Sequence, residues 1–302
     1  MTRRSSNPSR RSLRRPQPVV ALLAILLAAI ATGATAPAAQ PVQPRRIISL
    51  VPALTEMIFA MGAGDRVVAV SSYDDTPPQV QSLPRVGALI DPDVERIISL
   101  RPDLVLVYGS QTDLMTQLTR ASIPYFEYRH AGLAGVTATI RALGQRIGQS
   151  KEAEGVASRI ERQLEAIRKR TANLPKPRTM IVFGRERGSL SNIYASGGRG
   201  FLHDMLEAAG GVNVFADINA ESVQASTELI LIRAPEVIIE LRTAEMLHEE
   251  DRGQELKIWS ALASVPAVRN RRITLLTRKG LAVPGPGVGD STEEFAKVLH
   301  PR

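Results

Sequence analysis

The chain has 302 residues, no cysteine, a formal net charge of +8 and an aromatic content of 4%. Six arginines lie in the first 16 residues without an acidic residue among them, so that the rest of the sequence carries only +2. Because the remaining basic residues alternate with acids and aromatic side chains are few, the pattern argues against nucleic-acid binding, and the lack of cysteine excludes disulfides, thiolate metal sites and a cysteine-linked lipid.

The first 38 residues have the order of an export signal. A basic stretch precedes the apolar run Val19–Ala31, and small residues lead to an expected cleavage after Ala38. The run is about 13 residues long, short of the roughly 20 that cross a bilayer. We therefore expect residues 1–38 to be a signal peptide, residues 39–45 a short linker, and the mature protein to be periplasmic. An uncleaved anchor is the alternative, and residues 9–13 partly resemble a twin-arginine motif, so the export route stays open.

Residues 46–136 predict an N-terminal α/β lobe. Short apolar runs separated by helical patterns are typical of strands in a parallel sheet, and they occur at residues 47–51, 67–71, 104–108 and 125–128.

A helical connection is predicted over residues 137–174. Within it, Ser150–Ala172 has apolar residues at three- and four-residue spacing, which indicates one long helix with Ser150 as its N-cap. Pro175 and Pro177 end it. We interpret this helix as a rigid link between two lobes; a surface helix of one lobe is the alternative.

Residues 175–302 predict a C-terminal α/β lobe with strands at residues 179–184, 237–241 and 273–277. The only tryptophan, Trp259, lies in a helical pattern and is predicted to belong to the core.

Two sequence patterns recur in the same order on either side of the long helix. The stretch Glu95–Val107, ERIISLRPDLVLV, returns as Glu228–Glu240, ELILIRAPEVIIE. The group Leu54-Thr55-Glu56-Met57 with Gly62 returns as Leu202-His203-Asp204-Met205 with Gly210. The repetition predicts two similar Rossmann-like α/β lobes joined by a single long α-helix.

Residues 46–78 and 91–107 closely resemble the periplasmic cobalamin-binding proteins of bacterial ABC importers, and more broadly the substrate-binding proteins for iron chelates, haem and corrinoids. The resemblance extends from about Arg46 to Val298. It implies the architecture of a class III periplasmic binding protein and a ligand held between the lobes with little hinge motion.

The resemblance also implies that one glutamate in each lobe engages arginines of the membrane permease dimer. Those positions match Glu95 and Glu228 in this sequence. From the residues alone, an acid in the first turn of a helix also has a purely local explanation, because it stabilises the helix dipole.

Ligands of open α/β sheets bind outside the carboxyl ends of the strands. The loops expected there supply the predicted ligand-binding residues Leu54, Tyr73, Asp74, Ala88, Leu89, Tyr108, Tyr128, Arg185, Tyr194 and Arg242. Tyr73 is the strongest candidate, because its segment SSYDDTPP is similar to that of the cobalamin-binding proteins. Those proteins have a tryptophan in the loop that corresponds to Val86–Asp91, where this chain has no aromatic residue. The ligand therefore stays open between a corrinoid and another metal chelate.

Other residues favour alternatives within the same class. Tyr128 and His130 are of the types that ligate haem iron, and the arginines would suit a ligand with carboxylates, phosphate or catecholates. The four histidines show no paired spacing, and the glycine-rich segments 197–200 and 285–289 lack GxGxxG spacing, so that we expect neither a resident metal or cofactor nor an enzyme. The prediction is a monomeric periplasmic receptor that passes a corrinoid or related metal chelate to an ABC permease dimer; a ferric-siderophore or haem receptor is the alternative.

Overall fold

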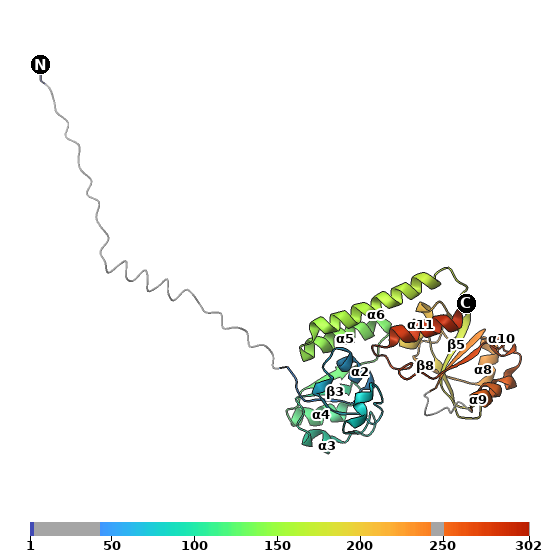
Figure 1. The fold of residues 1–302 in the computed structure, drawn as a ribbon, viewed down its shortest axis with the longest axis horizontal. Helices are drawn as coiled ribbons and strands as arrows, with labels where there is room; N and C mark the ends of the chain where they lie inside the picture. The colour runs from blue at the N-terminus through green and yellow to red at the C-terminus, as the bar shows by residue number, and fades with distance from the viewer. Residues whose placement is uncertain (3–42, 243–250, 302) are drawn as a thin grey trace. The chain divides into compact units, whose positions relative to one another are not determined.

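The computed structural model describes residues 1–2, 43–242 and 251–301. Residues Gln43–Arg302 form one compact unit, and the fold below is that of this unit (Figure 1). The predicted signal peptide and its alternative, an uncleaved anchor, fall almost wholly outside the described residues. Within the described residues, no helix combines the length and the apolar character needed to cross a bilayer.

The first sheet contains four parallel strands in the order β2-β1-β3-β4. They are β1 (Ile47–Ser49), β2 (Val67–Val70), β3 (Leu104–Tyr108) and β4 (Tyr125–Tyr128). All four predicted strands are confirmed. The helical segments of this lobe are α2 (Pro52–Ala60), η1 (Gly64–Arg66), η2 (Pro78–Ser82), α3 (Val94–Ser99) and α4 (Thr112–Arg120).

The second sheet has the strand order β10-β9-β5-β6-β8, with β7 beside β5. The strands are β5 (Arg178–Gly184), β6 (Ile193–Ser196), β7 (Val212–Asn213), β8 (Ser222–Ala225), β9 (Val237–Leu241) and β10 (Ile273–Leu276). The three predicted strands, β5, β9 and β10, are parallel to one another. The sequence prediction missed β7 and the antiparallel strands β6 and β8.

Strands β6 and β8 escaped prediction because each is short, includes exposed residues and contains small or polar side chains, IYAS and SVQA. A half-exposed strand of this kind has no continuous apolar run. The helices of this lobe are α7 (Phe201–Ala208), α8 (Thr227–Arg233), α9 (Arg252–Ile258), η4 (Trp259–Leu262), α10 (Pro266–Arg269) and α11 (Val288–Leu299).

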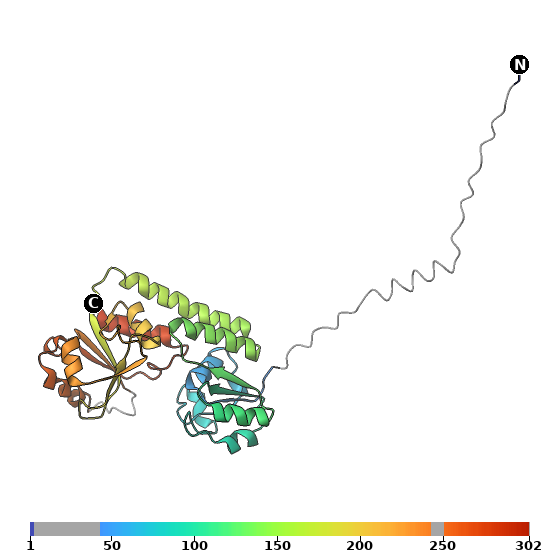
Figure 2. The ribbon, with the colours of Figure 1, turned by 180° about the vertical axis from the view of Figure 1, so that it is seen from behind.

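Two helices link the sheets, α5 (Leu133–Ile147) and α6 (Ser150–Thr171). Helix α6 runs alongside α5 and α11 (Figures 1 and 2), and its 22 residues span about 33 Å. Its predicted apolar stripe is confirmed, since Val156, Ile160, Leu164 and Ile167 are all buried. The N-cap prediction is wrong: Gln149 occupies that place, without a side-chain cap bond. The lobe boundary predicted at 136/137 falls inside α5.

One hydrophobic core extends through this helical layer into both lobes. It joins residues of α2, α5 and α6 to residues of α7, β9 and α11, among them Leu54, Ile140, Ile160, Met205 and Phe295. A second cluster under β8 and α8 contains the fully buried Trp259, which confirms the core prediction for that residue.

Both repeated sequence patterns are confirmed as repeated local structure. Helices α2 and α7 are each closed by a glycine with positive φ, Gly62 at 75° and Gly210 at 88°, a conformation that costs little only for glycine. Helices α3 and α8 each lead to a residue of positive φ directly before the repeated proline, Arg101 at 48° and Ala234 at 45°.

An arginine fixes each of these turns to the start of a central strand, Arg46 directly before β1 and Arg178 as the first residue of β5. Arg46 donates to the carbonyl oxygens of Leu100 and Arg101 at the end of α3, and Arg178 donates to the carbonyl of Arg233 at the end of α8. The acid that follows each repeated proline accepts a hydrogen bond from the backbone of the same arginine. Asp103 accepts the backbone N–H of Arg46, and Glu236 accepts that of Arg178.

The repeated acids Glu56 and Asp204 each reach toward the other half of the unit. Glu56 of α2 lies against the segment that follows β10, where a Cβ added to Gly285 would lie 2.7 Å from its Oε2. Asp204 of α7 accepts the backbone N–H of Leu133 at 2.7 Å and so caps α5. A side chain on Gly132 would overlap the Asp204 carboxylate. In each half, a glycine therefore lets a chain segment approach the acid of the opposite lobe.

Candidate functional site

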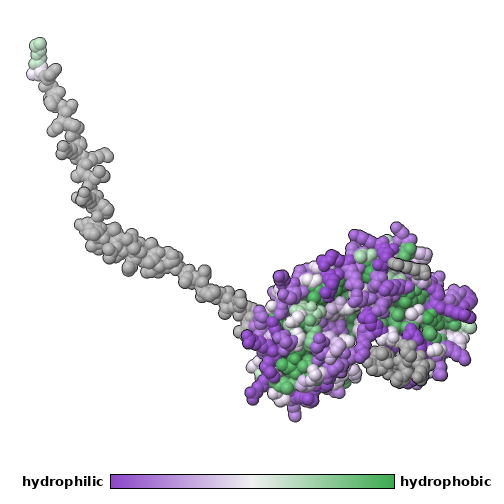
Figure 3. All heavy atoms as spheres, viewed as in Figure 1, coloured by the Kyte–Doolittle hydropathy of each residue, from purple (hydrophilic) through white to green (hydrophobic). Residues whose placement is uncertain are grey.

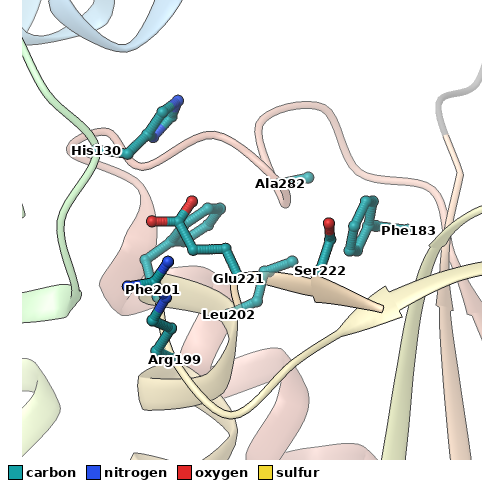
Figure 4. A pocket seen from close by; sticks show the side chains of 9 residues that line it. His130, Phe183, Arg199, Phe201, Leu202, Glu221, Ser222 and Ala282 are labelled. Carbon is teal, nitrogen blue, oxygen red and sulfur yellow. The ribbon is translucent and has the colours of Figure 1, made fainter. Parts of the chain in front are cut away.

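A cavity of about 230 Å³ is lined by residues from both lobes (Figure 4). His130 comes from the segment between β4 and α5, and Phe183 from the end of β5. The remaining lining residues belong to the turn before α7, to α7, to the start of β8 and to the segment after β10: Arg199, Gly200, Phe201, Leu202, Glu221, Ser222 and Ala282. The volume fits part of a macrocyclic ligand rather than the whole, since small-molecule sites commonly measure about 300–1,000 Å³.

The cavity combines apolar walls with a few ionisable groups. Phe183, Phe201 and Leu202 supply the walls. In Figure 4, His130 lies above the Glu221 carboxylate and the Arg199 guanidinium. Among the described residues, no side-chain hydrogen bond or ion pair engages Arg199 or Glu221. Their charges are therefore available to a ligand.

An aromatic cluster lies at the carboxyl ends of β3 and β4. The ring centroids of Tyr108 and Tyr128 are 5.9 Å apart, and those of Tyr128 and His130 are 5.2 Å apart. The Tyr128 hydroxyl lies 3.4 Å from Nδ1 of His130. Burial raises the pKa of both tyrosines, and the nearby carboxylate of Asp74 adds to the effect on Tyr108 and that of Glu221 to the effect on Tyr128. Both phenols are therefore neutral at physiological pH.

Several predicted ligand residues are exposed where a ligand could contact them. Tyr73 is 76% exposed in the loop after β2, Leu89 is 41% exposed, and Tyr194, which pairs with Gly184 at the end of β5, is 42% exposed. Ile90, beside Leu89, is 94% exposed and was not predicted. Ile90 lies in the loop Val86–Asp91, which has no aromatic residue, and it gives that loop an exposed apolar side chain.

Other predicted ligand residues support the loops from within. Leu54, Asp74 and Ala88 are buried. Asp74 accepts hydrogen bonds from the backbone N–H and the hydroxyl of Ser71, at 3.0 and 2.5 Å, and so fixes the turn that carries Tyr73. Burial raises the pKa of Asp74. Gln111 donates to the carbonyl of Leu89 and holds that loop against the end of β3.

Arg185 and Arg242 lie in a buried ionic network rather than on a ligand surface. The Arg185 side chain is 0% exposed and pairs with Glu240 at 2.9 Å and with Glu255 at 2.7 Å. Arg242 pairs with Glu240 at 2.7 Å, and the Trp259 indole N–H donates to the same carboxylate. Because carboxylates occupy their guanidinium groups, the two arginines are not free to bind a ligand, contrary to the sequence prediction.

Sequence reasoning missed Phe183, Phe201, Glu221, Ser222 and Ala282. Phe183 could have been predicted as a ligand-facing residue, because it lies next to the carboxyl end of a predicted strand. Ser222 begins β8 and Glu221 directly precedes it, and this strand had no detectable sequence pattern. Among the described residues, no group of three or more His, Asp or Glu side chains is arranged to hold a metal ion.

Glu95 and Glu228 occupy equivalent, exposed places in the first turns of α3 and α8. Both helices are capped by a side chain: Asp93 accepts the backbone N–H of Arg96 at 3.0 Å, and Ser226 accepts that of Leu229 at 3.2 Å. Hydrogen bonds from its own backbone N–H and from Ser226 lower the pKa of Glu228, so that its carboxylate is charged at neutral pH.

Two α/β lobes, a helical link and a cavity lined from both sides define a two-lobed solute-binding protein. The chain belongs to the periplasmic binding protein family, whose model matches residues 47–279. It is 31% identical over 196 residues to the vitamin B12-binding protein of Yersinia pestis (strain Pestoides F), an alignment that covers 64% of this chain and 68% of the relative.

Two solved structures are similar over most of the chain. The periplasmic vitamin B12 binding protein of Vibrio cholerae matches with a TM-score of 0.72 and 27% identity, covering 85% of this chain and 97% of the other. The apo form of a periplasmic heme-binding protein from Roseiflexus sp. RS-1 matches with a TM-score of 0.73 and 28% identity, covering 84% and 97%. The predicted family and the class III architecture are thereby confirmed.

Proposed function

We propose that this protein captures a corrinoid or a related metal chelate between its lobes in the periplasm and delivers it to an ABC permease. The observation that carries the proposal is the cavity, which has apolar walls, the unpaired Arg199 and Glu221 of the C-terminal lobe, and His130 on its other side. Such a site binds without chemistry, by burying an apolar ring system while a few polar contacts fix its orientation. Tyr73, Leu89, Ile90 and Tyr194 add exposed apolar surface at the strand ends.

Haem or a ferric siderophore is the second candidate, and the cluster of Tyr108, Tyr128 and His130 favours haem. His130 lines the cavity, and both tyrosine and histidine serve as axial ligands of haem iron. The structural relatives bind vitamin B12 in one case and heme in the other, so that the ligand must be decided by experiment.

The test is visible absorbance of the purified protein after it is mixed with cobalamin, cobinamide, haemin or a ferric siderophore and then desalted. A corrinoid receptor retains the cobalamin or cobinamide spectrum. If haemin is retained instead, His130→Ala or Tyr128→Phe will shift its main absorbance band, whereas Tyr125→Phe, at the opposite end of β4, will not. Retention of none of the four ligands would refute the proposed cargo class.

The carboxylates of Glu95 and Glu228 support docking to a permease dimer, because equivalent charged groups on two similar lobes suit a partner with two-fold symmetry. Exposed ion pairs contribute only ~0–1 kcal/mol each. We therefore expect Glu95→Lys or Glu228→Lys alone to weaken stimulation of the transporter ATPase several-fold, and the double variant to abolish it. Ligand affinity should be unchanged throughout; a loss of ligand affinity would contradict the docking role.

A further inference from the structure

Each helix that bears a docking glutamate also exposes an apolar side chain three residues later. In α3 this residue is Ile98, which is 39% exposed, and in α8 it is Leu231, which is 42% exposed. Residues three apart on a helix share one face, so that Ile98 adjoins Glu95 and Leu231 adjoins Glu228. In α8 the next residue, Ile232, is 77% exposed and widens the apolar surface.

Folding of the lobes does not account for these exposed side chains. The residue before each of them, Ile97 or Ile230, is 0% exposed and already anchors its helix in the core of its lobe. The two lobes therefore repeat an inner isoleucine, an outer apolar residue and an acid at the same places of the same sequence unit. Apolar areas on each lobe are visible among the mostly hydrophilic residues of the face in Figure 3.

We infer that Ile98 and Leu231, with Ile232 beside the latter, are apolar anchors of the permease-docking surface. The inference rests on the proposed function. Each anchor would enter an apolar depression of one permease subunit, next to the basic group that engages the neighbouring glutamate. Exposed ion pairs are weak and screened by salt, whereas the centre of a protein interface is apolar and surrounded by a polar rim. The charges orient the complex and the anchors hold it.

The second lobe should contribute more to the complex than the first. At the position that follows the outer apolar residue, α3 has Ser99 and α8 has Ile232. The C-terminal lobe therefore presents two adjacent exposed apolar side chains and the N-terminal lobe presents one. Apolar burial is roughly proportional to the area removed from water.

The experiment measures binding of ligand-loaded receptor to the complete importer of the same cell, reconstituted in phospholipid vesicles, at low and high salt. The variants are Ile98→Ala, Leu231→Ala, the double substitution of these two, and Leu231→Ala combined with Ile232→Ala, since alanine preserves helix propensity. Leu174→Ala is the matched control, because Leu174 is 38% exposed and lies outside α3 and α8. A second pair, Ile98→Gln with Leu231→Gln, keeps side-chain length but removes apolar character.

We expect each single alanine variant to weaken binding, Leu231→Ala combined with Ile232→Ala to weaken it more than Ile98→Ala, and the double variant of Ile98 and Leu231 to weaken it by about 10-fold or more. The loss should persist at high salt, with unchanged ligand affinity and an unaffected Leu174→Ala control. The inference is overturned if Glu95→Lys with Glu228→Lys abolishes binding while both apolar pairs bind within two-fold of the parent. If neither the charge reversals nor the apolar variants change binding, the docking role in the proposed function fails instead.

Discussion

Glu56 shows how the junction between the lobes sets the chemistry of a single residue. Its Oε1 accepts a hydrogen bond from the Thr76 hydroxyl at 2.5 Å, and Gly280 and Gly285 close over it. Burial raises its pKa from 4.5 to about 7, and the neighbouring acids Asp75 and Asp74 add to the effect, while the Thr76 hydrogen bond and Arg278 oppose it. The carboxyl group is therefore half-protonated near neutral pH.

We expect stability to depend on pH through this group. Because its folded pKa lies above its unfolded value, the folded state binds the proton more tightly; its stabilising contribution is complete below about pH 4.5 and is lost as the pH rises through about 7. The difference corresponds to roughly 3 kcal/mol at most. Glu56→Gln should gain stability relative to the parent between pH 5 and pH 8, measured as Tm at each pH. Parallel pH profiles for the two proteins would contradict this assignment.

The buried network of Arg185 shows why single residues of the site are hard to predict. An arginine after a strand looks ligand-facing in sequence, because the strand ends in a loop. The deciding information is Glu240, an acid inside the apolar run VIIEL, which needs a buried cationic partner. The buried charge of Glu240 requires cationic partners, and Arg185 and Arg242 supply them in the interior. Glu255, the other partner of Arg185, lies too far from it in the sequence for their contact to be expected.

At the scale of secondary-structure elements, the duplicated arginine contacts hold α3 and α8 in place. Arg178→Ala removes the bond to the carbonyl of Arg233, and a hydrogen bond with a charged donor at an exposed site contributes about 1 kcal/mol. We expect hydrogen exchange of the α8 amides to become several-fold faster, with the centre of β5 unaffected. Arg162→Ala, on the exposed side of α6, is the control. Equal exchange in both variants would show that the contact does not hold the helix.

The predictability of each strand followed its run of apolar or aromatic residues. The strands with such runs were predicted to within two residues, including β4, which is only partly buried. The long helix α6 was predicted from its apolar stripe, whereas its N-cap was not, because Gln149 makes no side-chain cap bond and is not a residue type typical of that position. The aromatic cluster and the loops at the strand ends followed from topology. The cavity wall from β8 could not be predicted, since its residues acquire a common role only when antiparallel pairing brings them to the site.

At the scale of the whole unit, the core shared by both lobes predicts cooperative unfolding. Leu54 and Met57 of the first lobe belong to the same buried cluster as Met205 and Phe295 of the second. We expect residues 43–302 without ligand to unfold in one calorimetric transition, with equal calorimetric and van't Hoff enthalpies. Two resolved transitions would show that the lobes are thermodynamically independent.

The apolar layer formed by α5, α6, α7 and α11 also has a mechanical meaning. Separating the two lobes would expose buried apolar side chains of this layer to water. Thermal motion alone should therefore seldom open the cavity fully. In the proposed importer, the free energy of ATP hydrolysis would have to act through the docking residues Glu95 and Glu228 to separate the lobes and release the ligand. The rigidity that retains a scarce ligand would then make ligand release the step that requires ATP hydrolysis.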